Sequence, residues 1–116
     1  MDFTGKTLIV TGAASGMGLL CAQEFAKHGA NVVMADCNEE AVIEKANEIG
    51  SNAIGVKCDV RNYDEVCAIC ELAMEQFGCI NFLVPMAGGA ECRVLKAKGE
   101  FPDIPIDVYD WGLDVN

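Results

Sequence analysis

Apolar residues follow two alternating patterns along this chain. Short continuous runs rich in β-branched residues have the length of strands, and they occupy residues 6–12, 31–36, 53–58 and 80–84. Between these runs the apolar residues recur every three or four positions, which predicts helices. Strands and helices in regular alternation indicate parallel strands joined by right-handed crossovers. We therefore predict an α/β fold built on a parallel sheet.

Polar caps and glycines give the predicted boundaries of the three intervening helices. The helices are expected over residue 16 to Gly29, Asn38 to Gly50, and Asn62 to Gly78. Their apolar stripes are expected to face the core: Val42, Ala46 and Ile49 in the second helix, and Val66, Cys70, Ala73 and Phe77 in the third. The last run, residues 80–84, is of the continuous apolar kind that is buried on both faces of a parallel sheet.

The last quarter of the sequence is less regular. Residues 89–106 contain Pro102 and Pro105 and predict an irregular surface connection. Asp107 follows a proline and predicts the N-cap of a final helix. The apolar face of that helix is expected to comprise Val108, Trp111 and Val115.

Composition narrows the class of protein. The chain has 116 residues, of which 52% are hydrophobic, and this is enough for one folded domain over residues 1–116. A net charge of −10 disfavours nucleic acids and anionic membrane surfaces as partners. No run is long enough to span a bilayer, and the N-terminus lacks the basic segment of a signal peptide, so we expect a cytoplasmic protein.

The seven cysteines are odd in number and lie mostly in apolar segments, so we expect reduced and buried thiols. Cys67 and Cys70 form a Cys-x-x-Cys pair, but no second pair follows at ligand spacing, so no metal site is predicted. His28, near the end of a helix, is expected to complement the helix dipole. Four methionines are expected to serve in packing: Met17, Met34, Met74 and Met86.

The first strand leads into "TGAASGMG", Thr11 to Gly18. Gly12 permits a tight turn out of the strand, Gly16 lets a phosphate approach the backbone, and Gly18 lets the next helix pack close to the sheet. The N-terminus of that helix offers free N–H groups to a pyrophosphate. No Gly-Lys-Ser/Thr follows, so a P-loop is excluded. We predict a dinucleotide site that also involves Ser15 and Met17, although such a turn also occurs without a ligand.

Asp36 ends the second strand, 18 residues after Gly18. This spacing matches that of an acid that accepts hydrogen bonds from the ribose hydroxyls of a dinucleotide. A carboxylate there repels a 2′-phosphate, and neighbouring Ser15 supplies no cation, so NAD is favoured over NADP. The alternative role of Asp36 is that of a turn residue at the end of a strand.

Together these motifs resemble the N-terminal half of a short-chain dehydrogenase/reductase. Thr11 and the three glycines match the Thr-Gly-x-x-x-Gly-x-Gly pattern of that family, and Asp36 matches its ribose-binding acid. Asp59 and Val60 match its Asp-Val pair, which lies along the adenine ring. The resemblance implies a Rossmann-like, doubly wound parallel sheet with strand order 3-2-1-4, and a full-length form that is a homo-oligomer.

One stretch departs from the family pattern. Where the family has Asn-Asn-Ala-Gly, this chain has Pro85, Met86, Ala87 and Gly88. Ala87 and Gly88 keep the thin backbone that, by resemblance, lets the nicotinamide ribose come close. Met86 lacks the amide that ties neighbouring strands in the family, and Pro85 lacks a backbone donor.

By resemblance, Asn116 matches the asparagine of the family's catalytic tetrad, which holds a water molecule in a proton relay. The serine, tyrosine and lysine of the tetrad would lie further along, so the domain is expected to be truncated before that region. The favoured hypothesis is an NAD-dependent oxidoreductase that transfers hydride between NAD(H) and a small alcohol or carbonyl substrate. A non-catalytic nucleotide-binding module is the alternative. A methyltransferase is a third hypothesis, disfavoured by the long loop between Gly12 and Gly18.

Overall fold

A computed structural model describes the backbone of residues 1–116 and the side chains of all but residues 91, 92 and 101. The chain forms two compact units, Met1–Met86 and Ala87–Asn116. The first unit contains a parallel sheet of four strands and three helices, and the second contains only short helices. The two units are described separately.

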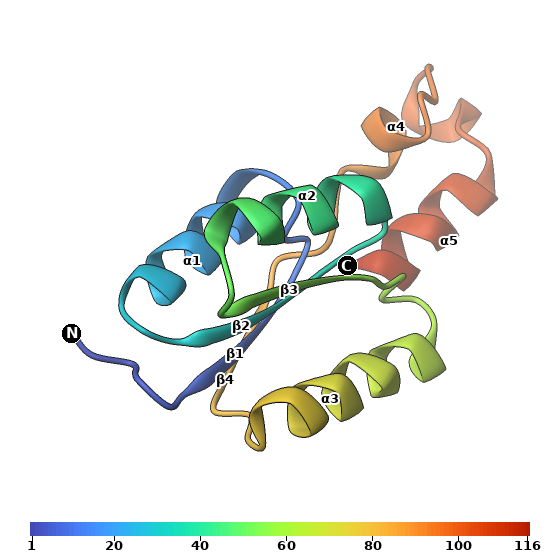
Figure 1. Cartoon of the computed structure of the whole chain (residues 1–116). Helices are drawn as coiled ribbons and strands as arrows, with labels where there is room; N and C mark the ends of the chain where they lie inside the picture. The colour runs from blue at the N-terminus through green and yellow to red at the C-terminus, as the bar shows by residue number, and fades with distance from the viewer. The chain divides into compact units, whose positions relative to one another are not determined.

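In the first unit, strands and helices alternate as the sequence predicts (Figure 1). The elements in chain order are β1 (Thr7–Thr11), α1 (Gly16–Lys27), β2 (Asn31–Asp36), α2 (Glu39–Ile49), β3 (Ala53–Lys57), α3 (Tyr63–Phe77) and β4 (Phe82–Pro85). The strand order is β3-β2-β1-β4 with all pairs parallel, which confirms the predicted fold class and strand order. Because the chain moves outward to β3 and then returns past β1 to β4, the sheet is doubly wound.

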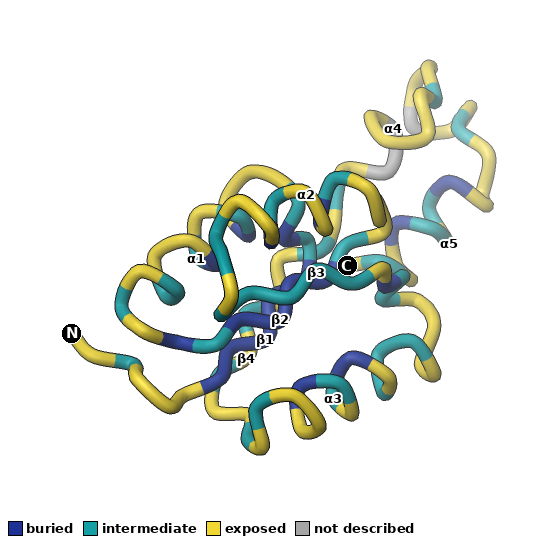
Figure 2. Tube along the Cα trace, in the orientation of Figure 1, coloured by how far each residue is buried: buried dark blue, intermediate teal, exposed yellow. Residues whose placement is uncertain are grey.

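Side-chain alternation in β1 and β2 produces two cores, one on each face of the sheet (Figure 2). Leu8, Val10, Val32 and Met34 pack beneath α1 and α2, whereas Ile9, Val33 and Ala35 pack against α3. All five residues of β1 are buried. A central strand with both faces covered explains the continuous apolar sequence of this run.

Strand β4 lies at an edge of the sheet, and its burial differs from the expectation. Its residues alternate between half-buried and exposed, and Leu83 is 62% exposed. The prediction of burial on both faces is therefore wrong for β4 in this unit, because α3 packs over β1 and β2. Pro85 pairs with Thr11 without a donor of its own, and the N–H of Met86 bonds the carbonyl of Thr11 at 3.1 Å.

Three phenylalanines connect the N-terminal segment to the sheet. Phe3 stacks on Phe25 of α1 with ring centroids 4.6 Å apart, and Phe82 of β4 lies edge-on to both at 5.5 Å. The N–H of Phe3 also bonds the carbonyl of His28 at 2.8 Å. Offset and edge-to-face pairs of this kind stabilise beyond the area they bury.

Several expectations about individual side chains are wrong. Of the described cysteines only Cys58 is buried, and Cys37 is exposed. Met34 is buried as expected, but Met17, Met74 and Met86 are 70%, 51% and 37% exposed. In α3 the buried residues are Ile69 and Ala73, and the remaining predicted stripe is half-buried against the same core: Val66, Cys70 and Phe77.

The second unit contains α4 (Glu91–Val94), a 3₁₀ turn η1 (Phe101–Asp103) and α5 (Ile106–Val115). The expectation of an irregular connection is thus wrong in part. Pro102 is accommodated because it lies at the start of η1, where its missing N–H would have no helical partner. Helix α5 starts after Pro105, not Asp107. Asp107 therefore lies in the first turn instead of at the N-cap, and Val108 and Gly112 are the buried residues.

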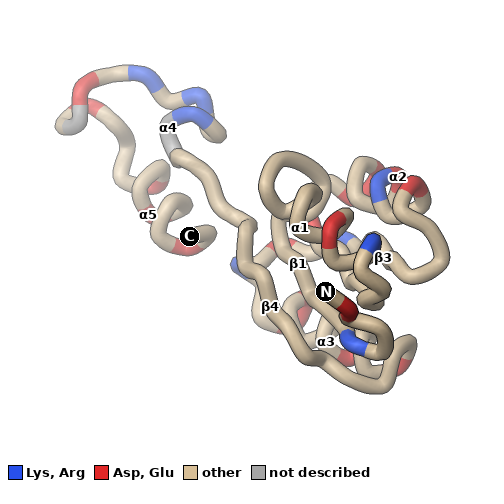
Figure 3. Tube along the Cα trace, turned by 90° about the vertical axis from the view of Figure 1, so that its left-hand side faces the viewer, with Lys and Arg blue, Asp and Glu red and all other residues tan. Residues whose placement is uncertain are grey.

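Charge is unevenly spread along the chain. Arg93, Lys96 and Lys98 follow one another closely in the second unit, in a protein whose net charge is −10 (Figure 3). Acids predominate along α2 and α3 of the first unit, in keeping with the overall charge. Among the helices described by the structure, none has the length and apolar character needed to cross a membrane.

Candidate functional site

The candidate site of the first unit lies at the carboxyl ends of the parallel strands. The loop from Gly12 to Ser15 follows β1, Asp36 ends β2, and Asp59 and Val60 follow β3. In a parallel sheet these ends lie at the same edge, where α/β proteins of this topology bind their ligands. The structure thus brings together the predicted cofactor residues of the first unit.

The geometry of the glycine loop supports the roles inferred from its sequence. Gly12 has a φ of 67° and Gly16 a φ of 58°, a region that side-chain-bearing residues rarely adopt. A Cβ on Gly18 would overlap the carbonyl of Gly12, so the helix contacts the loop directly. A Cβ on Gly16 would meet nothing within 4 Å. Open space therefore lies against the backbone at Gly16, as a phosphate requires.

The N-terminus of α1 differs from those of α2 and α3. The side chain of its N-cap, Ser15, makes no capping hydrogen bond, and its first turn carries no acid. By contrast, Asn38 caps α2 and Asn62 caps α3, and both of those helices have two acids in the first turn. Helix α1 therefore retains free N–H groups and an uncompensated positive dipole end that suit an anion.

Asp36 has a structural role as well as the predicted binding role. Its Oδ2 accepts the N–H of Ala14 at 3.0 Å, and its Oδ1 accepts the N–H of Asn38 at 3.0 Å. The carboxylate therefore braces the glycine loop against the end of β2. Its Oδ1 also accepts the S–H of Cys37 at 3.6 Å. Since a carboxylate has about four lone-pair positions, Oδ2 can accept a further hydrogen bond, as a ribose hydroxyl would need.

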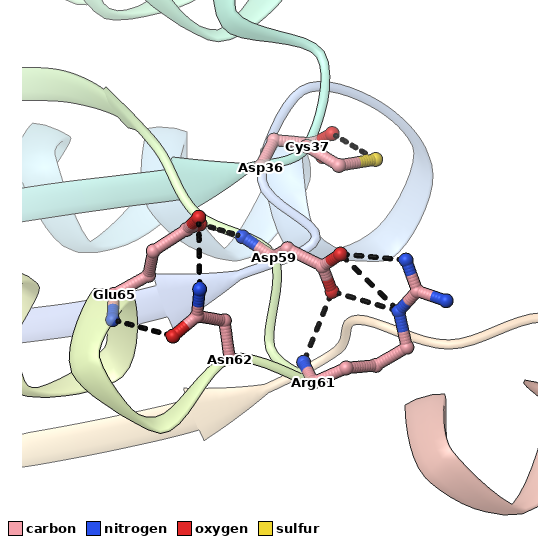
Figure 4. A network of polar contacts seen from close by, with 6 residues as sticks. All are labelled: Asp36, Cys37, Asp59, Arg61, Asn62 and Glu65. Atoms are coloured by element: carbon pink, nitrogen blue, oxygen red, sulfur yellow. Dashed lines mark hydrogen bonds and ion pairs between the residues drawn. The ribbon is translucent and has the colours of Figure 1, made fainter.

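Asp59 belongs to a polar network that the sequence did not predict (Figure 4). Its carboxylate accepts three side-chain hydrogen bonds from Arg61, from Nη2 to Oδ2 at 2.7 Å and from Nε to Oδ1 and Oδ2 at 3.0 and 3.2 Å. The backbone N–H of Arg61 adds a fourth at 3.0 Å. Hydrogen bonding by Arg61 lowers the pKa of Asp59 from 3.8 to about 2. The Asp-x-Arg spacing was the available signal.

Hydrogen bonds also fix the backbone around Asp59. Its N–H bonds Oε2 of Glu65 at 2.6 Å, and its carbonyl accepts the N–H of Asn62 at 2.9 Å. Asn62 caps α3 through the N–H groups of Asp64 and Glu65, so the start of α3 fixes the end of β3. The N–H of Val60 has no hydrogen-bond partner among the described residues.

The two cysteines nearest this edge are poor nucleophiles. Cys37 is exposed beside Asp36, and partial burial and the negative charge of Asp36 raise its pKa. Burial raises the pKa of Cys58, followed by the charge of Glu65. Both thiols are therefore held in the protonated, unreactive form. Among the side chains that the structure describes, no cluster of three or more acids, histidines or cysteines could hold a metal ion.

In the second unit, Asn116 clamps the chain that carries Gly88. Its Oδ1 accepts the N–H of Gly89 at 3.0 Å, and its Nδ2 donates to the carbonyls of Gly89 and Gly112 at 3.0 and 2.8 Å. A Cβ on Gly88 would collide with Oδ1 of Asn116. Ala87, Gly88 and Asn116, which the sequence assigned to cofactor and catalysis, thus lie in the same unit, and Gly88 and Asn116 are in contact.

The doubly wound sheet, glycine loop and acid at the end of β2 define a dinucleotide-binding protein of the Rossmann type. This chain belongs to the short-chain dehydrogenase family, whose model matches residues 6–116. That membership decides against the methyltransferase alternative.

Three relatives illustrate the match. The oxidoreductase UcpA of Salmonella typhimurium is 40% identical over 117 residues, covering 97% of this chain and 41% of the relative. The 7alpha-hydroxysteroid dehydrogenase of Escherichia coli is 36% identical over 88 residues, covering 73% and 34%. A crystal structure of a short-chain dehydrogenase/reductase from Burkholderia phymatum in complex with NAD aligns with a TM-score of 0.85 at 30% identity, covering 99% of this chain and 40% of that one. The chain thus spans less than half the length of each.

Proposed function

We propose that this chain forms the cofactor-binding part of an NAD-dependent dehydrogenase or reductase acting on a small alcohol or carbonyl compound. The observation that carries the proposal is the open N-terminus of α1, uncapped and free of acids beside the glycine loop. The relative from Burkholderia phymatum, crystallised with NAD, supports the same cofactor. We also infer a cytoplasmic location and a homo-oligomeric full-length form.

The residues present fit the cofactor. Gly12, Ser15, Gly16, Met17 and Gly18 would hold the pyrophosphate through backbone N–H groups. The remaining assignments are Asp36 to the adenosine ribose, Asp59 and Val60 to adenine, and Ala87 and Gly88 to the nicotinamide ribose. The open space at Gly16 and the unpartnered N–H of Val60 are the features that a bound dinucleotide would use.

Asp36 is the basis for favouring NAD over NADP. Its carboxylate would meet the 2′-phosphate of NADP with like charge, which is destabilising. Of the cations near this edge, Arg61 is directed to the carboxylate of Asp59, and Lys57 stands opposite Asp36 in the register of β2 and β3. Neither forms an ion pair with Asp36 among the described contacts, so the carboxylate stands unpaired where the two cofactors differ.

When bound, the nicotinamide supplies or accepts the hydride. Asn116 is proposed to hold a water molecule of the proton relay, as the family resemblance implies. Its Nδ2 is occupied by two carbonyls, so the water would be held by the second lone pair of Oδ1. Neither tyrosine of the chain, Tyr63 or Tyr109, is followed four residues later by lysine. Proton transfer is therefore assigned to no tyrosine of this chain.

A charge placed at the start of α1 tests the cofactor assignment. Met17 is 70% exposed in the first turn, so Met17→Asp adds an acid without disturbing the core. The aspartate should stabilise the helix slightly, by about 0.3–1 kcal/mol, while repelling the pyrophosphate. NAD affinity, measured by calorimetry, should fall at least about tenfold, with an unchanged or higher melting temperature.

Met17→Asn is the matched control, because it has the size of aspartate and no charge. It should retain most of the NAD affinity. Equal affinity for NAD in the aspartate and asparagine variants would show that the pyrophosphate does not lie at this helix end, and the proposed function would lose its main support. Turnover by a catalytically complete protein would then separate an enzyme from a non-catalytic nucleotide-binding module.

A further inference from the structure

A cleft lies between the C-terminal ends of α1 and α2, which run side by side over one face of the sheet (Figure 1). Its volume is about 370 Å³, at the lower end of the range of about 300–1,000 Å³ for small-molecule pockets. The cleft is at the end of α1 opposite to the one assigned to the pyrophosphate. Three segments line it: Gln23, Ala26 and Lys27 of α1, Glu48 and Ile49 of α2, and Asn52 of the turn before β3.

Asn52 carries a free hydrogen-bond acceptor at this cleft. Its Nδ2 donates to the carbonyls of Ala26 and Ala30 at 3.2 and 2.7 Å, so both N–H groups are used and the orientation of the side chain is set. Its Oδ1 has no hydrogen-bond partner among the described residues and can accept one from a ligand. The half-buried side chains of Ala26 and Ile49 add an apolar surface beside it.

Opposite charges flank the cleft on its two helices. On α1, Nζ of Lys27 pairs with Glu24 at 3.5 Å. On α2, Glu48 pairs with Lys45 at 2.9 Å, so each charge has its partner on its own helix and not across the cleft. Lys27 is 70% and Glu48 50% exposed. Because exposed ion pairs contribute little to stability, a ligand can share or replace these partners at small cost.

The two helix ends favour one orientation of a dipolar ligand. Lys27 lies in the last turn of α1, whereas α2 has no basic residue in its last turn. The negative end of the α2 dipole, together with Glu48, therefore favours an ammonium group. Each oxygen of Glu48 accepts one hydrogen bond from Lys45 and keeps a lone pair for it. On the other wall, Lys27 and the amide of Gln23, which has no hydrogen-bond partner in the described part of the chain, favour a carboxylate.

We infer that this cleft binds a free α-amino acid with an aliphatic side chain. The carboxylate of the ligand meets Lys27 and Gln23, its ammonium group meets Glu48 and Asn52, and its side chain packs on the apolar surface between them. A simple anion or cation would meet a charge of its own sign on one wall, whereas a zwitterion complements both walls. The site is separate from the candidate cofactor site and does not depend on the cofactor assignment.

Leucine and two analogues with a single charge test the inference. Isopentylamine is leucine without its carboxylate, and isocaproate is leucine without its ammonium group. NMR titration of the chain, followed at the side-chain amides of Gln23 and Asn52, should give a Kd for leucine on the order of 1 mM. Each analogue should bind at least about fivefold more weakly, the effect of losing one exposed charge contact. Saturating NAD should leave the affinity for leucine unchanged.

Substitutions at the two walls should each remove one part of this preference. Lys27→Met should lower the affinity for leucine to about that of wild-type protein for isopentylamine. Glu48→Gln should lower it to about that of wild-type protein for isocaproate. Both positions are exposed, so the melting temperatures should change little. Lys98→Met is the control, because it removes an exposed cation of the second unit and should leave all three affinities unchanged.

Equal affinities for the three compounds would show non-specific binding through the apolar chain and would overturn the inference. The same conclusion would follow from no binding of leucine at tens of millimolar, from its displacement by NAD, or from shifts that leave Gln23 and Asn52 unmoved. None of these results would affect the proposed function, which Met17→Asp and Met17→Asn test separately.

Discussion

At the scale of single residues, Asp36 has the bracing role that the sequence offered as one alternative, and the ribose-binding role is the one that we propose in addition. It braces the glycine loop through Ala14 and the next turn through Asn38, as a strand-end turn residue does. Its Oδ2 still has a lone pair for a ribose hydroxyl, whereas Oδ1 accepts from both Asn38 and Cys37. Substitution should therefore affect both folding and cofactor binding.

Asp36→Ala should weaken NAD binding by about ten- to a hundredfold and narrow the gap to NADP. Removing a hydrogen bond to a charged group costs about 1.5–3 kcal/mol, and each 1.4 kcal/mol is about a factor of ten in affinity. Calorimetry with both cofactors provides the measurement. Asp36→Asn is the control, since it removes the charge but keeps one oxygen as a hydrogen-bond acceptor. The free energy of unfolding of this variant should lie between those of wild-type protein and Asp36→Ala. Unchanged NAD affinity in Asp36→Ala would exclude Asp36 from the ribose site.

The pair between Asp59 and Arg61 predicts a dependence of stability on pH. The folded protein holds the pKa of Asp59 near 2, below its ordinary value of 3.8. A lowered carboxyl pKa stabilises the folded state fully above the ordinary value, and this stabilisation is lost as the pH falls through the folded value. The effect is small because both side chains are partly exposed.

Arg61→Met should lower the free energy of unfolding near neutral pH by less than about 1 kcal/mol, because solvent screens the pair. The difference from wild-type protein should shrink below about pH 4 and vanish near pH 2. Urea denaturation across this range, repeated at high salt, checks the prediction. A difference that stays constant with pH would mean that the variant loses packing by the arginine stem instead of the ion pair.

At the scale of elements, the sequence predicted the order of strands and helices in the first unit. Each helix has an apolar pattern that repeats over several turns, and caps or glycines mark its ends. The sequence did not predict η1, because Pro102 suggests a break but is tolerated at the start of a 3₁₀ turn. The predicted buried face of α3 was centred on Val66 and Cys70, whereas the structure buries Ile69. The two faces are easily confused, since neighbouring stripes on a helix differ by only a small rotation.

The candidate site could be predicted where it depends on local sequence patterns, but not where it depends on a contact made by the fold. Glycine spacing and a strand-end acid are local patterns, so the sequence singled out Gly12, Gly16, Gly18 and Asp36, and the structure brings these residues to one edge of the sheet. The link from Arg61 to Asp59 depends on the turn after β3, which brings two residues of opposite charge into bidentate contact. Spacing alone did not show that the two side chains would meet in this way.

Helix α2 packs on β3 through a glycine that has no special backbone conformation. A Cβ on Gly55 would lie 2.5 Å from the carbonyl oxygen of Val42 and 2.8 Å from Cα of Ile43. Both contacts are to backbone, so neither can move aside cheaply. The close approach of helix and strand therefore depends on the missing side chain at Gly55.

Gly55→Ala should destabilise the protein by about 1–3 kcal/mol, the range for overpacking a core. Chemical denaturation measures the change. Gly16→Ala provides a comparison, because its Cβ would have open space and only the positive φ of 58° would cost energy. A neutral effect of Gly55→Ala would mean that α2 shifts away from β3 at little cost.

At the scale of the whole molecule, the net charge of −10 should make copies of the chain repel one another, whereas the edge strand β4 should promote their association. Leu83 is 62% exposed on that edge strand. An apolar edge with unpaired backbone groups invites pairing with another chain. The 116-residue chain should therefore associate at high protein concentration and high salt, where charge repulsion is screened.

Leu83→Lys should reduce this association, with a change in stability within about 0.5 kcal/mol, as is usual for an exposed position. Sedimentation velocity over a range of concentrations provides the measurement. Leu113→Lys is the matched control, because Leu113 is 81% exposed on α5 and belongs to a helix, not to a strand of the sheet. Equal reductions in the two variants would point to added charge as the cause, not to the β4 edge.

The pairing of β1 with β4 also has a consequence for how the protein is made. Strand β1 receives its first neighbour, β2, early in the sequence, but its second neighbour lies beyond residues 12–81. Contacts across such a separation form slowly, because the intervening chain must be closed into a loop. During synthesis the side of β1 that pairs with β4 thus has no partner strand until residues 82–85 have left the ribosome. In that interval the central strand of the finished protein is the one most exposed to misassembly.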